Sequence, residues 1–410
     1  MSHRLTVPSG NLISAAVFGL GLYLGGGQAA FAAPPDACAY LSKTVRAQPS
    51  GPVFLPSYPT VESGPLQGVA FLYDNAAAAI ALVACGDSEA ATRIGDAILL
   101  ALAHDRYWHD GRLRNGYMAG PVRPEPVKLA GWWDTKQNMW VEDRYQVGSD
   151  NGNMAWAMLA LLALDRPNSD HRYRAGAAQI GSWIGQWQSK TAPGGFTGGA
   201  FGHEPLPAAQ TWKSTEHNTD LAAAFARLAQ TTGDDKWLPQ ATAAQQFVRD
   251  MWTPSCSCFV VGTGTDGQTR NPYMALDAQI WPLLAIPGAA LGYRETVATV
   301  NSRLTDDRGF AYSEAKEGLW TEGTAQVALL MALSGNTAQA KRLVDAVDAM
   351  QLPDGSYYAT SRKELPTGFM LDTDPTKPRQ YFHIAHLAAV SWAALAMRRY
   401  NPFTGTNALP

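Results

Sequence analysis

The stretch SDNGNMAWAMLALLAL (residues 149–164) places five polar or small residues directly before eleven apolar ones. A helix that is apolar on every side is a buried helix. The same arrangement, a polar or acidic start followed by an apolar run, recurs along the chain at intervals of 45 to 76 residues. The other starts are YDNA (73–76), TEHN (215–218), LDAQ (276–279), TEGT (321–324) and YFHI (381–384).

Amphipathic segments alternate with these six apolar ones, at 37–47, 89–104, 170–188, 235–252, 289–304 and 336–350. Alternating buried and amphipathic helices predict an all-α fold, an (α/α)6 barrel in which an outer ring of helices surrounds an inner ring. Pro282 lies inside the fourth apolar segment. Because proline lacks a backbone N–H, we expect a kink there or a helix that starts nearer Ile280.

Two long loops lead into inner helices, at 107–148 and 192–214, so both are expected to line the same end of the barrel. The first is rich in tryptophan, and its alternating residues 139–147 predict a small β-hairpin at the rim of a cleft.

The N-terminus has the three parts of a secretory signal peptide. A positive start precedes an apolar stretch and the small-residue site AFA at 30–32. We therefore predict a signal peptide at 1–32, a single barrel domain at 33–410 and a periplasmic or extracellular location. An uncleaved anchor is the alternative.

The four cysteines, Cys38, Cys85, Cys256 and Cys258, fit one or two disulfides in an exported protein, with the pairing left open. A zinc site at the last two is the weaker alternative, and no metal or organic cofactor is expected.

The formal net charge of −3 argues against a nucleic-acid partner. Many of the 13 tryptophans and 15 tyrosines must lie in the core, but such a supply also suits stacking on sugar faces.

Six inner helices that begin with acidic motifs resemble those of the six-hairpin glycosidase superfamily, over about residues 37–400. That superfamily includes glycoside hydrolases, polysaccharide lyases and sugar epimerases. The resemblance implies a cleft at the N-terminal ends of the inner helices, where all six motifs fall, and a carbohydrate substrate.

Glycoside hydrolysis needs two carboxylates, one on each side of the scissile bond. We expect Glu216 and Glu322 to be this pair, since each follows a threonine that can cap its helix, and Asp150 is a third catalytic candidate. The structural alternative is that acids are simply favoured in the first turn of any helix.

Further residues are predicted to bind substrate through hydroxyl contacts or ring stacking. His383 and His386 lie three apart on the expected sixth inner helix, as an acid–base pair or as core residues. Trp156, Trp281 and Trp392 are expected in the core. The predicted binding residues are Asp74, Asn151, His217, Asn218, Asp277, Trp132, Trp140, Trp212, Trp320 and His383.

The sequence therefore predicts an exported glycoside hydrolase acting on a polysaccharide or oligosaccharide, with inversion as the expected stereochemistry. One alternative is a polysaccharide lyase or sugar epimerase, for which Arg144, Lys213 or Arg379 would have to supply positive charge. The other is a non-catalytic glycan-binding protein of exopolysaccharide synthesis or secretion. The oligomeric state stays open.

Overall fold

The computed structural model describes residues 36–165, 170–371 and 374–410. The chain divides into Met1–Ala33 and Pro34–Pro410, and every described residue belongs to the second unit. The predicted signal peptide at 1–32 lies outside the described residues. Within the described ranges, no helix is both long and apolar enough to cross a membrane.

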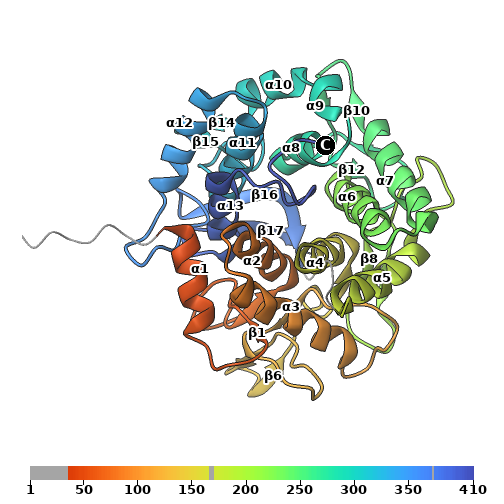
Figure 1. Ribbon diagram of the computed structural model, residues 1–410, viewed down its shortest axis with the longest axis vertical. Helices are drawn as coiled ribbons and strands as arrows, with labels where there is room; N and C mark the ends of the chain where they lie inside the picture. Colours follow the sequence, from red (N-terminus) through yellow and green to blue (C-terminus); the bar gives the residue numbers. More distant parts are fainter. Residues whose placement is uncertain (1–35, 166–169, 372–373) are drawn as a thin grey trace, which may run out of the picture. The chain divides into compact units, whose positions relative to one another are not determined.

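Six helices follow one another around the centre of this unit (Figure 1). Each packs on the next in chain order, and the last packs on the first. Almost all of their residues are buried, as their apolar sequences predict. They are α2 (Leu72–Ala84), α4 (Asn151–Leu164), α6 (Thr215–Thr232), α8 (Leu276–Ala285), α11 (Thr321–Leu333) and α13 (Leu387–Arg398).

Amphipathic helices pack on the outside of these six, each with one buried face. The helix expected over 289–304 is split in two, and the expected helices at 170–188 and 235–252 have short 3-10 turns at one end. The outer elements are α1 (Ala37–Arg46), α3 (Ser88–Ala103), α5 (Arg172–Ile184), η1 (Gly185–Trp187), η2 (Asp235–Trp237), α7 (Leu238–Asp250), α9 (Ala289–Gly292), α10 (Glu295–Arg303) and α12 (Thr337–Asp348).

The predicted start of the sixth inner helix at residue 381 is wrong. Residues Asp374–Phe382 form strand β17, which pairs antiparallel with β16 (Glu364–Leu371). Tyr381 lies opposite Leu365 in this ladder, so its backbone is extended, and α13 begins only at Leu387. Pro282, in contrast, remains inside α8, which starts at Leu276.

A polar residue at the fourth position of four inner helices fixes the preceding loop. The side chain of this polar residue forms hydrogen bonds with both the N–H and the C=O of one residue in an earlier loop or short strand, at donor–acceptor distances of 2.7–3.5 Å. Both groups of that loop residue are thereby satisfied away from water. The pairs are Asn75–Leu55, Asn218–Phe196, Gln279–Phe259 and Thr324–Phe310.

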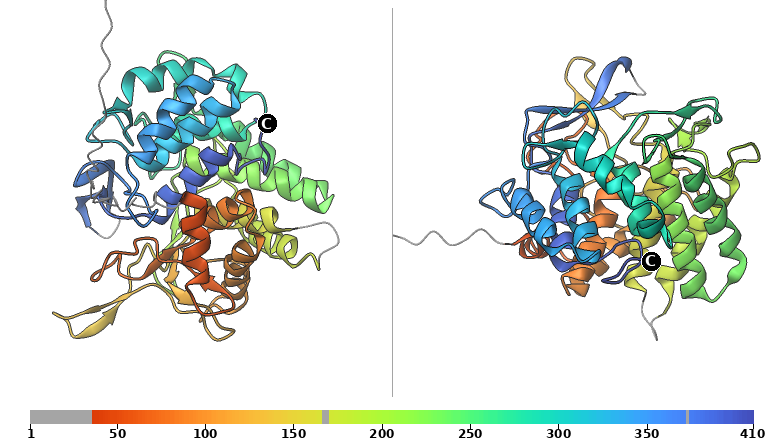
Figure 2. Two further views of the ribbon diagram at one scale, coloured as in Figure 1. Left: turned by 60° about the vertical axis from the view of Figure 1, so that its left-hand side comes forward. Right: turned by 90° about the horizontal axis from the view of Figure 1, so that it is seen from above.

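Short strands gather on one side of the helices (Figure 2). The three-stranded sheet β7–β8–β9 lies beside the start of α4, and of the hairpin arm predicted at 139–147 only Met139–Val141 forms a strand, β6, which pairs with β5. The strands are β1 (Val53–Phe54), β2 (Val69–Phe71), β3 (Gly116–Met118), β4 (Gly120–Pro121), β5 (Trp132–Asp134), β6 (Met139–Val141), β7 (Ser149–Asp150), β8 (Gly199–Phe201), β9 (Ala208–Gln210), β10 (Trp252–Thr253), β11 (Cys258–Phe259), β12 (Gly262–Thr263), β13 (Arg270–Asn271), β14 (Thr305–Asp306) and β15 (Gly309–Phe310).

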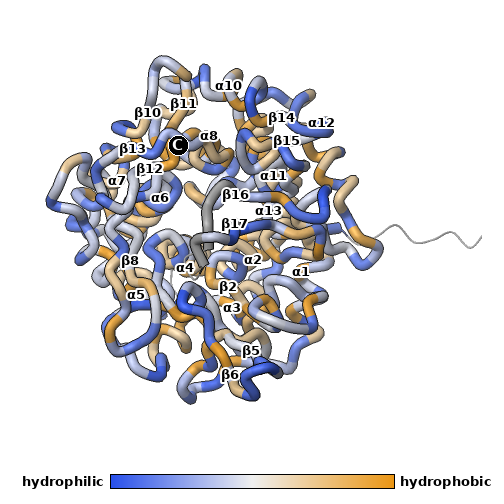
Figure 3. Tube along the Cα trace, turned by 180° about the vertical axis from the view of Figure 1, so that it is seen from behind, coloured by the Kyte–Doolittle hydropathy of each residue, from blue (hydrophilic) through white to orange (hydrophobic). Residues whose placement is uncertain are grey.

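The hairpin β16–β17 lies across the middle of the inner helices when the molecule is viewed from behind, and β17 is drawn in hydrophilic colours (Figure 3). The hydroxyl of Tyr273 donates to the carbonyl oxygen of Thr367 on β16 at 2.7 Å. The ring of Tyr381 on β17 packs against Trp320 at the start of α11. The hairpin therefore contacts residues that closely precede α8 and α11.

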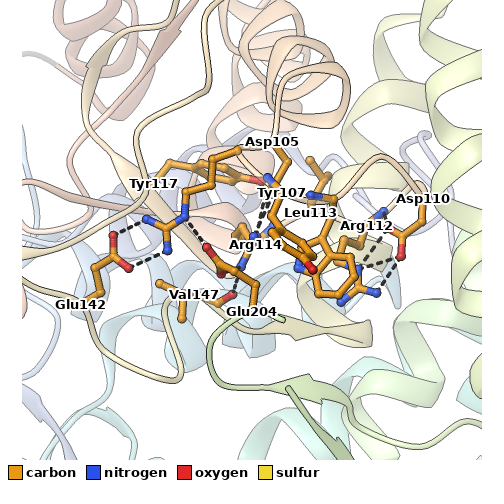
Figure 4. Close-up of polar contacts among 12 residues, drawn as sticks. Asp105, Tyr107, Asp110, Arg112, Leu113, Arg114, Tyr117, Glu142, Val147 and Glu204 are labelled. Atoms are coloured by element: carbon orange, nitrogen blue, oxygen red, sulfur yellow. Dashed lines mark hydrogen bonds and ion pairs between the residues drawn. The ribbon is translucent and has the colours of Figure 1, made fainter. Parts of the chain in front are cut away.

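An ionic network ties three rim segments together (Figure 4). Arg106 binds both carboxylate oxygens of Glu142 at 2.6 and 2.7 Å and also pairs with Glu204. Arg114, which is fully buried, joins Glu204 at 3.1 Å and Asp105 at 2.6 Å. The loop after α3, the base of hairpin β5–β6 and the β8–β9 turn are thus fixed to one another.

Two disulfides resolve the pairing that the sequence left open. Cys38 in α1 is bonded to Cys85, which follows α2, and Cys256 is bonded to Cys258 between β10 and β11. The second bond engages both sulfurs of the alternative zinc site. Across the described residues, no group of three or more His, Cys, Asp or Glu side chains is arranged to hold a metal ion.

Candidate active site at the N-terminal ends of the inner helices

Acidic side chains at the starts of five inner helices act on one another and form one acidic cluster: Asp74, Asp150, Glu216, Asp277 and Glu322. The cluster shows in the electrostatics: the charges of Asp277, Glu322 and Asp150 all raise the pKa of Glu216. The charges of Asp74 and Asp277 likewise raise the pKa of Glu322. Each acid also lies at the positive end of a helix dipole, which favours its charged form and opposes this mutual repulsion.

Glu322 is held by a directed chain of hydrogen bonds. The indole N–H of Trp392 donates to the Tyr73 hydroxyl oxygen at 2.7 Å, so the Tyr73 O–H is free to donate to Glu322 Oε1, and it does. The side chain is 2% exposed, and Oε2 has no hydrogen-bond partner. Burial raises the pKa of Glu322 to about 7, against the lowering effects of His386 and Tyr73.

Glu216 and Asp277 form a second pair of acids. Burial is the main cause that raises the pKa of Glu216 well above its usual range, and the Asp277 charge adds to it. Asp277 is buried and accepts the N–H of Ala278 at 2.6 Å. Burial raises the pKa of Asp277 to about 6. Glu216 is only partly buried, so it is the member of the pair that a ligand can reach.

Asp74 faces a buried histidine. The Nε2 atom of His386 lies 3.3 Å from Oδ2 of Asp74, and the imidazole stacks on Tyr58 with ring centroids 4.7 Å apart. Burial alone would lower the pKa of His386, but the charges of Asp74 and Glu322 outweigh burial and raise it. A protonated His386 therefore offsets part of the negative charge of the cluster.

His383 does not join His386, so the prediction that they share a helix face is wrong. His383 lies in a bend after β17, whereas His386 has an extended backbone and is the N-cap residue of α13, so neither histidine lies inside the helix. His383 is exposed, stacks on Tyr358 at 3.8 Å and lines a surface hollow of about 520 Å³ with Val61 and Lys363. None of the clustered acids lines this hollow or the one of about 700 Å³ beside α1.

Sequence reasoning missed Asp220, although a lone acid one turn after Glu216 in a largely apolar helix was a readable signal. Asp220 is fully buried, and burial, followed by the Glu216 charge, raises its pKa well above the usual range. The indole of Trp156 is close enough to oppose this rise, but neither Asp220 oxygen has a partner in hydrogen-bond geometry.

Buried polar atoms without hydrogen-bond partners concentrate around these acids. Such atoms are rare in proteins because leaving one unpaired costs about 1–3 kcal/mol. Acceptors and donors occur together, the combination that a polyhydroxylated ligand satisfies. The atoms are Asp220 Oδ1 and Oδ2, Glu322 Oε2, Gln326 Oε1, His217 Nδ1, His386 Nδ1, Trp156 Nε1 and Trp281 Nε1.

The prediction that Thr215 and Thr321 cap the helices of Glu216 and Glu322 is wrong. Ser214, not Thr215, is the N-cap of α6, and its side chain accepts the N–H of His217. Thr215 lies inside the helix and donates to the carbonyl of Val260 at 2.6 Å. Trp320 is the N-cap residue of α11, without a side-chain bond, because Thr321 already belongs to the helix.

The two predicted asparagine ligands are fully buried. Asn218 uses its amide to hold both backbone groups of Phe196, so its role is structural. Asn151 donates to the carbonyl of Thr197 at 2.7 Å and keeps an unpaired Oδ1. Asp150, directly before α4, is buried too, and its charge acts on Glu216.

The predicted stacking tryptophans lie in different environments. Trp320 is 1% exposed and packs on Tyr312, so its ring has no surface for a sugar, and that prediction is corrected. Trp212 is partly buried beside His217, with ring centroids 5.3 Å apart. Trp132 and Trp140 lie on hairpin β5–β6. Trp156, Trp281 and Trp392 are buried in the core, as predicted.

One cation approaches the acids from hairpin β16–β17. The guanidinium of Arg379 lies over the ring of Tyr145 at 4.8 Å, and its charge lowers the pKa of Glu216 and of His217. Burial is the larger cause of the low pKa of His217, about 4, which leaves this imidazole neutral at pH 7. Lys213, by contrast, is buried and donates to the carbonyl of Thr191.

The fold is similar to that of solved glycosidases. A glycosidase in complex with glucose is 16% identical, over 88% of this chain and 95% of that chain, with a TM-score of 0.57. A family 76 glycoside hydrolase from a bovine Bacteroides thetaiotaomicron strain is 14% identical, over 88% of this chain and 77% of that chain, with the same TM-score. No protein-family model matches the chain, and a search of the curated proteins finds no match. The likeness is one of fold.

Proposed function

We propose that the protein is a glycoside hydrolase with an (α/α)6 barrel. The cyclic order in which α2, α4, α6, α8, α11 and α13 contact one another supports the barrel, as does the fold shared with solved glycosidases. Fold alone does not decide function. The observation that carries the proposal is the cluster of carboxylates with raised pKa values and unpaired oxygens at the helix starts.

Glu216 and Glu322 take the two catalytic roles. Hydrolysis needs a protonated acid beside an ionised base, and a pair whose environments separate the pKa values supplies both. Glu216, with a pKa well above its usual range and a partly exposed side chain, is the general acid. Glu322, with a pKa of about 7 and an unpaired Oε2, is the general base that activates water. Asp277 keeps Glu216 protonated through its charge.

Tyr73 and the Asp74–His386 pair act as positioning groups. Tyr73 fixes one oxygen of Glu322 and leaves the other free for water. The charge of His386 lowers the pKa of Glu322, which allows the base to ionise near neutral pH. Water that Glu322 deprotonates attacks the anomeric carbon from the face opposite Glu216, while Glu216 gives its proton to the leaving oxygen, so we propose inversion.

The substrate is a polysaccharide or oligosaccharide. Asp150, Asp220, His217 and Trp212 surround the acids and offer hydroxyl partners or a ring to a sugar, while Trp132 and Trp140 stand on the rim. This assignment, like export to the periplasm or outside the cell, is part of the proposal.

A polysaccharide lyase is the second candidate, and Arg379 is the observation that favours it. A lyase must neutralise the carboxylate of a uronic acid, and Arg379 lies beside Tyr145, a hydroxyl that could exchange the proton. The excess of acids around it favours hydrolysis instead. The two reactions differ in product, since a lyase leaves an unsaturated sugar and a hydrolase does not.

The test is reducing-sugar release from a panel of neutral and acidic polysaccharides. Wild type is compared with Glu216→Gln, Glu322→Gln and, as a matched control, Glu125→Gln on an exposed loop. We expect release by wild type and by the control, and its loss in both cluster variants with folding retained. Activity that survives both cluster substitutions would remove this catalytic pair. Ultraviolet-absorbing unsaturated products would establish the lyase, and binding without any turnover would establish a glycan-binding protein.

A further inference from the structure

Hairpin β5–β6 carries two large aromatic side chains that are about half exposed to solvent. Trp133 is 53% exposed and Trp140 is 45% exposed, whereas most tryptophans of the described residues are buried or partly buried. The two residues are directly opposite each other in the antiparallel ladder. Their indoles therefore project from the same face of the hairpin, about 5 Å apart at Cβ.

The hairpin is held in place at its tip and at its base. At the tip, Asp134 accepts the N–H groups of Lys136 and Gln137 and the side-chain amide of Gln137. At the base, Glu142 follows β6 directly and is bound bidentately by Arg106 of the rim network (Figure 4). A paired aromatic surface on an ordered hairpin loses little freedom on binding.

The position of Trp140 is fixed by a glycine. A Cβ on Gly131 would lie 2.6 Å from Nε1 and 2.7 Å from Cε2 of Trp140, so the indole lies directly against the backbone at Gly131. The ring is seated on the chain, and nearly half of it still faces solvent.

The size of this surface decides between partners. An aromatic side chain buries roughly 150–250 Å² when it is covered, so two half-exposed indoles offer about 200 Å². A stable protein–protein interface needs about 800 Å² on each side. The flanking side chains of Asp134, Lys136 and Gln137 are polar, and Met139 on β6 is apolar and 51% exposed. A surface of this size with a largely polar border fits one or two sugar rings of a glycan chain.

We propose that Trp133 and Trp140 form a glycan-binding platform outside the acidic cluster. The apolar faces of neutral pyranose rings stack on the two indoles. The hairpin projects from the same side of the helices as β16–β17, so a bound chain lies at the end of the molecule where the acids are (Figure 2). The platform would give the proposed hydrolase a preference for polymers over short oligosaccharides, and its binding itself does not depend on hydrolysis.

Affinity electrophoresis tests the platform, in gels that contain dextran, mannan, xylan or hydroxyethylcellulose. All proteins carry Glu322→Gln, so that no glycan is cut during the run and binding is measured whether or not the chain is a hydrolase. The double variant carries both Trp133→Thr and Trp140→Thr, since threonine keeps the β-propensity of the hairpin. The matched control is Leu291→Thr on α9, another exposed apolar residue.

We expect at least one neutral glycan to retard the parent protein. The apparent affinity for that glycan should be at least tenfold weaker in the double variant and unchanged in the control, and all three proteins should have equal unfolding midpoints. Absence of retardation in all four gels would overturn the proposal, as would equal retardation of parent and double variant. A double variant that instead loses self-association in size-exclusion chromatography, or binding to phosphatidylcholine vesicles, would assign the surface to a second copy or to a membrane.

Discussion

The pKa of Glu322 predicts how replacing this residue changes stability with pH. Its value in the folded protein is about 7, compared with 4.5 for an ordinary glutamate. A carboxyl whose pKa is raised by folding binds its proton more tightly in the folded state, so its contribution is fully present below pH 4.5 and is lost as the pH rises through about 7. Each pH unit corresponds to about 1.4 kcal/mol, which gives a loss of about 3 kcal/mol across this window.

The substitution Glu322→Gln removes this loss, because the amide keeps the shape and the acceptor for Tyr73 but never ionises. We therefore expect the free energy of unfolding of the variant, relative to wild type, to increase by about 3 kcal/mol between pH 4.5 and pH 8.

Urea denaturation of both proteins at several pH values measures this difference, with Glu125→Gln as the exposed control. A difference that stays constant with pH would show that Glu322 is already ionised in the acid range, and would refute the reasoning about its burial.

Three further changes have expected outcomes. Tyr73→Phe removes the hydrogen bond that lowers the pKa of Glu322, so the acid limb of the kcat/KM profile should move to higher pH; an unmoved limb would contradict the assignment of the base. Replacing Cys38 and Cys85 by serine removes a cross-link between residues 47 apart and should lower the free energy of unfolding by about 4 kcal/mol, against about 1 kcal/mol for the disulfide between Cys256 and Cys258, which are two residues apart. Asn218→Leu leaves the N–H and C=O of Phe196 unpaired and should lower the free energy of unfolding by roughly 2–5 kcal/mol in denaturation experiments. A loss below about 1 kcal/mol would show that these two hydrogen bonds do not hold the loop.

The inner helices could be predicted because a helix without a polar face is stable only when it is buried on all sides. The run after residue 149 has one polar patch only at its start, and α4 is buried along nearly its whole length. The predicted start of the sixth inner helix was wrong because aromatic residues such as Tyr381 and Phe382 suit a strand as well as a buried helix. Only the pairing of β17 with β16, a contact between segments, decides between them.

The acids of the site were predictable for a related reason, since inner-helix starts must meet at one end of the molecule. Their partners were not. The hydroxyl that fixes Glu322 comes from Tyr73, 249 residues earlier, and the partner of Asp74 is His386 at the other end of the chain. Such pairings follow from tertiary packing. Asp220 could have been found, as a charge without a local partner in a buried helix.

The central claim is that the acidic cluster hydrolyses glycosidic bonds, and a proton NMR time course on a glycan cleaved in the panel tests it most directly. For wild type, we predict new anomeric signals of reducing ends, with the anomer opposite to that of the cleaved bond appearing first, and no new signals with Glu216→Gln or Glu322→Gln. The account would be contradicted by vinyl proton signals of an unsaturated product, or by reducing ends that form equally fast in either variant.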